Sequence, residues 1–106
     1  MTKAVLIHEK LGSVVEIDLD INPVKNEIFK TLQGPATFIG QWPELDVVIM
    51  KRVSAEGEQN SNTLPSPFSG ECILGKILLV RMDADSEPQD FTLDEYNKFI
   101  LQRTQE

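Results

Sequence analysis

The apolar run at residues 73–82, ILGKILLVRM, constrains the fold more than any other segment of the chain. Its side chains are apolar at both odd and even positions for most of its length. Because successive side chains of a strand point to opposite faces, this pattern predicts a central strand of a sheet. Gly75 interrupts the run, which indicates a bulge or a close backbone contact.

A second strand is predicted over residues 15–21, where apolar residues at every second position alternate with acids. Period-two alternation of this kind is typical of a half-buried strand. A short apolar run at residues 4–7 precedes it, and Gly12 lies between the two. We therefore expect an antiparallel hairpin with a loop of about four or five residues.

The first helix is predicted over residues 23–33. Asn22 is a good N-cap, and Pro23 loses no needed donor at the first helical position. Gly34 permits a left-handed C-terminal cap. The expected apolar stripe consists of Val24, Ile28, Phe29 and Leu32.

The second helix is predicted over residues 93–103. It follows Thr92, which forms a capping box with Glu95. Tyr96, Phe99 and Ile100 then recur at helical spacing.

Two further strands are predicted over residues 37–40 and 46–52, with a turn at residues 40–44. The order of elements is then β-β-α-β-β-β-α. We expect an α+β fold, a mainly antiparallel sheet of about five strands with two helices against it. A chain of 106 residues has the usual size of one domain, so residues 1–106 are interpreted as a single domain.

The net charge of −7 argues against two classes of function. No cluster of Lys and Arg offers a basic face to phosphates, so we expect neither nucleic-acid binding nor binding to anionic membranes. The N-terminal apolar run is too short for a secretory signal, and no run could cross a membrane. We therefore expect a cytoplasmic protein.

The chain holds one cysteine and one histidine, Cys72 and His8. A disulfide within the chain and a histidine-rich metal site are thereby excluded. Acids at alternate positions of residues 83–87 resemble half of a calcium loop, but Pro88 stands where that loop needs Gly. We expect no metal, no cofactor and no catalytic residue, although an enzyme stays open as an alternative.

The long polar segment at residues 54–70, SAEGEQNSNTLPSPFSG, is the first candidate for a site. Connections of this length are usually functional or disordered. Its first limb, residues 55–62, offers carboxylates and amides, and its second limb, residues 63–68, is stiffened by prolines. The alternative is a plain surface loop. The candidate residues for binding a ligand or a partner are Trp42, Arg52, Glu56, Glu58, Asn60, Asn62 and Phe68.

Trp42 is the one tryptophan of the chain and lies between Gly40 and Pro43. In a turn it could anchor a partner, because Trp contributes strongly to interfaces. The alternative is that it covers one end of the sheet.

The segments KAVLI, VEIDLD, NEIFKTLQG and GKILLVRMD followed by DFTLDEY resemble, in this order, a family of small domains of unknown function of the 3846 type. That family occurs in phages, plasmids and bacteria, with relatives in algae. The resemblance implies one compact α+β domain and no established activity, cofactor or catalytic residue. Bacterial members carry other motifs where this chain has Lys51-Arg52 and residues 63–68, so the chain looks more like a eukaryotic variant.

Three functions follow as hypotheses. The first is a non-catalytic binding or regulatory domain that contacts a protein partner through residues 54–70. The second is a small-ligand binder or enzyme that uses Arg52 with carboxylates of that segment. The third is an acidic decoy for DNA-binding proteins. A homo-oligomer is also possible, through an edge or face of the strand at residues 46–52.

Overall fold

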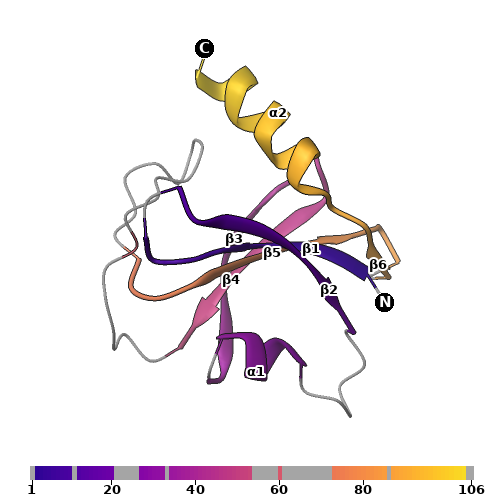
Figure 1. Ribbon diagram of the computed structural model, residues 1–106. Coiled ribbons are helices and arrows are strands. Elements are labelled where there is room, and N and C mark those ends of the chain that lie inside the picture. The colour runs from indigo at the N-terminus through magenta and orange to yellow at the C-terminus, as the bar shows by residue number, and fades with distance from the viewer. Residues whose placement is uncertain are drawn as a thin grey trace.

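The computed structural model describes residues 2–10, 12–20, 27–32, 34–53, 60, 73–85 and 87–104. They form one antiparallel sheet with a helix on each face, which confirms the expected α+β class (Figure 1). The strands are β1 (Thr2–Ile7), β2 (Val14–Leu19), β3 (Ala36–Trp42), β4 (Val47–Arg52), β5 (Ile77–Met82) and β6 (Pro88–Gln89). The helices are α1 (Glu27–Leu32) and α2 (Leu93–Thr104). Strand order is β2-β1-β5-β4-β3, with β6 paired to β5.

The predicted central strand is β5, which lies between β1 and β4. Four successive residues, Ile77 to Val80, have no exposed surface, because both faces of β5 are covered. The strand begins at Ile77 rather than at position 73. Gly75 has a φ of +84°, which lies outside the range of a strand and delays its start.

The expected hairpin is formed by β1 and β2, which pair from Thr2 with Leu19 to Ile7 with Val14. A hydrogen bond of 2.9 Å from the His8 N–H to the Ser13 carbonyl closes the turn. Val15 was expected on the buried face, yet it is 38% exposed, because β2 is an edge strand of the sheet. Ile21 lies outside the described residues.

Strand β3 runs through Trp42, although residues 40–44 were predicted as a turn. The burial of Trp42, with 1% of its surface exposed, holds this part of the chain on the sheet. The register shifts between Phe38 and Gly40, which marks a bulge. The turn follows at residues 43–46, and Asp46 has a φ of 56°. The two-residue β6 was not predicted, since so short a strand carries no periodic pattern.

Two apolar cores lie on the two faces of the sheet, one under each helix (Figure 1). The α2-side core consists of Val5, Ile7, Trp42, Val47, Ile49, Ile73, Ile77, Leu79, Phe91, Tyr96 and Phe99. The α1-side core consists of Ala4, Leu6, Leu19, Leu32, Met50, Leu78 and Val80. Alternate residues of β1, β4 and β5 enter one core or the other, as strand geometry requires.

Helix α2 confirms the predicted capping box. The Glu95 N–H donates to the Thr92 hydroxyl at 3.2 Å, and the Thr92 N–H donates to Glu95 Oε1 at 3.3 Å. Both bonds satisfy N–H groups that lack a partner within the helix. No described helix is long and apolar enough to cross a membrane.

Helix α1 is described from Glu27 to Leu32, and the predicted start at Asn22-Pro23 lies outside the described residues. Phe29 was expected on the buried stripe but is 49% exposed. Gly34 was expected to adopt a left-handed cap, and it is absent from the described glycines with positive φ. Glycine is required at position 34 for a steric reason, because a Cβ there would lie 2.7 Å from Cδ of Arg52.

Candidate functional site

The candidate site lies where β4 ends and β5 begins. Ile77 is the register partner of both Ile7 and Lys51, so the ends of β1 and β4 meet the start of β5. We call this the loop end of the sheet, because residues 53–76 leave and return there. The other end holds the β3–β4 turn and the connection from β5 to β6.

Hydrogen bonds to described main-chain carbonyls hold Asn60 at the loop end. Its N–H donates to the Ile73 carbonyl at 2.8 Å, and Nδ2 donates to the carbonyls of Gly75 at 2.9 Å and Ile7 at 3.4 Å. Only 7% of its surface is exposed. Asn60 was predicted as a ligand-binding residue, but both protons of its amide nitrogen point to main-chain carbonyls. It therefore anchors the segment between β4 and β5.

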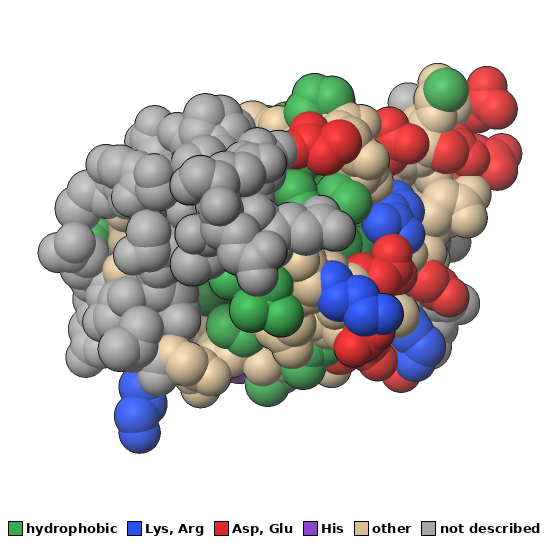
Figure 2. All heavy atoms as spheres, turned by 90° about the horizontal axis from the view of Figure 1, so that it is seen from above, with side chains coloured by type: hydrophobic (Ala, Val, Ile, Leu, Met, Phe, Trp, Pro, Cys, Tyr) green, Lys and Arg blue, Asp and Glu red, His purple; other side chains and the backbone are tan. Residues whose placement is uncertain are grey.

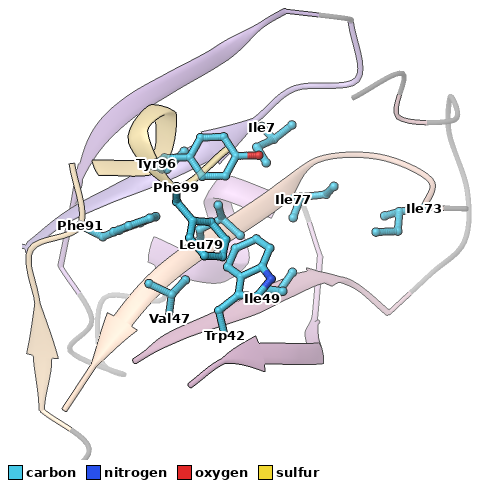
Figure 3. Packing of buried hydrophobic residues seen from close by; sticks show 11 residues of the cluster. Ile7, Trp42, Val47, Ile49, Ile73, Ile77, Leu79, Phe91, Tyr96 and Phe99 are labelled. Atoms are coloured by element: carbon cyan, nitrogen blue, oxygen red, sulfur yellow. The ribbon is translucent and has the colours of Figure 1, made fainter. Parts of the chain in front are cut away.

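Trp42 lies at the other end of the sheet, in the α2-side core. Its ring centroid is 5.0 Å from that of Phe99, with the planes tilted by 58°. Figure 3 shows its side chain gathered with Tyr96, Phe99 and Leu79 in this core. Its burial corrects the prediction of an exposed anchor for a partner. The alternative, that Trp42 covers an end of the sheet, matches the structure.

Arg52 is the last residue of β4 and is half-buried. The methylenes of its side chain lie against Gly34, at the end of α1. Arg52 and Asn60 are thus the two predicted site residues found at the loop end. The other four, Glu56, Glu58, Asn62 and Phe68, lie outside the described residues, so the carboxylate-based ligand site stays a prediction.

Among the described residues, bases predominate at one end of the sheet and acids at the other. The described bases at or beside the loop end are Lys10, Lys51, Arg52 and Lys76, with Glu9 among them. The described acids at the other end, which we call the acidic end, are Asp20, Glu44, Asp46, Asp83, Asp85, Glu87 and Asp90, with the bases Lys3 and Arg81 among them. Figure 2 shows acids on the α2 face toward the right of the view, with Lys and Arg side chains among them. These residues are scattered along the chain, so only the fold brings them together.

Arg81 is a residue that sequence reasoning missed. Its guanidinium pairs with Glu95 at 2.7 Å and lies over the ring of Phe91 at 5.2 Å. Nε donates to the Leu45 carbonyl at 2.9 Å. Arg81 therefore ties the start of α2 to β5 and to the β3–β4 turn. Its partners come from distant parts of the chain, and no local pattern marks them.

Asp83 belongs to the calcium-like segment, and its oxygens accept hydrogen bonds from the turn itself. Oδ1 accepts from the N–H groups of Asp85 and Glu87, and Oδ2 accepts from Gln89 Nε2 at 3.0 Å. The bond from Glu87 is the main cause that holds the pKa of Asp83 below its usual value. Among the described residues, no group of three His, Cys, Asp or Glu side chains could hold a metal ion.

Comparison with known proteins adds a family to this geometry. The model of a family of unknown function, DUF5880, matches residues 5–99. The chain belongs to the DUF5880 family. The match begins in β1 and ends in α2, so this DUF5880 domain includes both ends of the sheet described above. Neither the curated proteins nor the solved structures contain a match. The family description assigns no activity.

Proposed function

We propose that this DUF5880 domain is a non-catalytic binding or regulatory domain, which contacts a protein partner at the loop end of its sheet. The observation that carries the proposal is the length of the connection between two adjacent strands. Strands β4 and β5 are antiparallel neighbours, with Lys51 opposite Ile77. About two to five residues suffice to join such strands. The chain uses residues 53–76, which are 24 residues (76 − 52 = 24).

The hydrogen bonds of Asn60 add support. A buried polar group costs free energy unless it finds hydrogen-bond partners. A connection that only links two strands has little need of a buried amide that fixes its path. Asn60 instead holds its part of the connection against β1 and the start of β5. Long segments positioned by a rigid sheet are frequent sites of recognition. We also propose that this domain is related to the phage, bacterial and algal domains of the 3846 type.

The test is quantitative affinity capture with three folded baits. The first is the wild type, and the second replaces residues 61–70 with a Gly/Ser segment of equal length that leaves Asn60 intact. The third is a matched control, Asp85→Ser with Glu87→Ser, which changes exposed residues at the acidic end. We expect the wild type and the control to enrich the same proteins, and the second bait to lose them. Equal enrichment by all three baits, or none by the wild type, would contradict the proposal.

A further inference from the structure

We propose that two copies of this chain pair through β3, edge to edge and antiparallel, to form one continuous sheet across a two-fold axis. This inference does not depend on the proposed function, because β3 is not part of the Asn60 anchor. Strands β2 and β3 form the two edges of the sheet, and they differ in their side chains and in the charges at their ends.

Strand β3 is the end of the strand order, so among the described strands only β4 pairs with it. The possible edge predicted at residues 46–52 is not found, because β4 lies between β3 and β5 and is an interior strand. An edge strand presents a row of N–H and C=O groups that can pair with another strand.

The two edges of the sheet differ in how they discourage such pairing. Strand β2 carries Glu16 and Asp18, whose charges would enter any strand-to-strand contact. Strand β3, ATFIGQW, has no charged residue and no proline. Proteins commonly protect free edges with charge, proline or a bulge. Of these devices β3 has only the bulge between Phe38 and Gly40, which limits the paired length and indicates a weak dimer.

Exposed aromatic side chains accompany the β3 edge. Phe38 is 65% exposed, and its register partner is Met50, which belongs to the α1-side core. Phe29, on α1, is 49% exposed on the same side of the sheet. A second strand beside β3 would cover part of the Phe38 ring, and burial of apolar surface favours association.

The charges near the two ends of β3 favour a second copy of the chain in the antiparallel orientation. Antiparallel pairing of β3 with its symmetry mate sets the loop end of one copy beside the acidic end of the other. Lys51 then lies on the side of the partner's β3–β4 turn, which carries Glu44 and Asp46. A parallel arrangement would place like charges together. The net charge of −7 makes two copies repel each other at long range. We therefore expect the orientation in which the loop end of one copy lies close to the acidic end of the other.

The test is sedimentation of the full chain over roughly 10 to 500 µM, which covers the micromolar dissociation constants of weak interfaces. We expect the mass to rise from 11.9 kDa toward twice that value. Phe38→Lys adds an edge charge at an exposed position and should raise the dissociation constant by about tenfold or more. Val15→Lys is the matched control, because Val15 is also an exposed apolar residue on an edge strand, and it should leave the constant unchanged.

Charge exchange tests the orientation. Lys51→Glu should weaken the dimer, and the double variant Lys51→Glu with Glu44→Lys should recover it. Circular dichroism of each variant establishes that it is folded. A wild type that stays monomeric over the whole range would overturn the proposal. A dimer sensitive to Val15→Lys but not to Phe38→Lys would also overturn it, because that result assigns the contact to β2.

Discussion

Glu16 of β2 accepts a hydrogen bond from the backbone N–H of Leu93, the first residue of α2, at 3.0 Å between Oε1 and N. The same carboxylate lies 3.4 Å from Nζ of Lys3. The first N–H groups of a helix lack partners within the helix, and its N-terminus favours negative charge. Glu16 therefore connects the edge hairpin to the helix that covers the α2-side core.

Replacing Glu16 with Gln should lower the free energy of unfolding by about 1 kcal/mol, because the charge at the helix N-terminus and the pairing with Lys3 are lost. Urea unfolding followed by circular dichroism measures the change. Asp18→Asn is the matched control, since Asp18 lies 4.0 Å from the same lysine and is 63% exposed at its side chain. Equal effects of the two substitutions would show that the negative charge of Glu16 beside the Leu93 N–H contributes nothing.

Asn60→Ala should destabilise the protein by about 1–3 kcal/mol, because the carbonyls of Gly75 and Ile7 lose their donor. Amide hydrogen exchange should accelerate around Ile73, whose carbonyl accepts the Asn60 N–H. Asn97→Ala, an exposed position of α2, provides the control and should change little. Unchanged stability of Asn60→Ala would argue against an anchoring role.

Gly34→Ala should cost about 1–3 kcal/mol, because the new Cβ would meet the Arg52 side chain at 2.7 Å from Cδ and 3.0 Å from Cγ. A double-mutant cycle separates the two explanations for this glycine. If crowding is the cause, Arg52→Ala should remove most of the cost of Gly34→Ala. If a left-handed backbone were the cause, the cost would be the same in both backgrounds.

Tyr96 should make stability depend on alkaline pH. Burial raises the pKa of its hydroxyl from 10.0 to about 12, because the charged form is poorly solvated in the core. Below about pH 10 the hydroxyl is protonated in both the folded and the unfolded chain, so its contribution to stability is fully present. Above that pH the unfolded chain releases the proton first, so stability falls as pH rises from about 10 through about 12.

The chain has one tyrosine, so tyrosinate absorbance reports this group alone. Tyr96→Phe provides the reference for the unfolding curves, because lysines also titrate in this range. The difference between wild type and variant should shrink or reverse as pH rises through that window. A tyrosinate midpoint near 10 in the folded protein would contradict the buried position.

Local patterns predicted the elements whose causes are local. Thr92 and Glu95 lie three residues apart, so their capping box follows from the sequence whatever the rest of the fold does. The alternation of β2 and the apolar run of β5 likewise identified strands, because side-chain direction in a strand depends only on position. Two boundaries differ from those predicted, since Gly75 delays β5 and the burial of Trp42 extends β3.

The residues of the candidate site behaved differently. Asn60 was expected to face a ligand, and its partners Ile7 and Gly75 lie in β1 and just before β5, in separate parts of the chain. Gly34 was identified as necessary, but its crowding by Arg52 arises only when β4 passes the end of α1. Such contacts cannot be read from spacing, because they join residues far apart in sequence.

The sequence by itself determined an antiparallel α+β architecture, because alternation, apolar runs and caps act over a few residues. Only the tertiary structure decided which strands are edges, where Trp42 and Asn60 lie, and that acids from distant segments gather at one end of the sheet. The physical reason is the same for each. Burial, hydrogen bonding and charge act through space, and the pairing of distant strands sets which residues are neighbours.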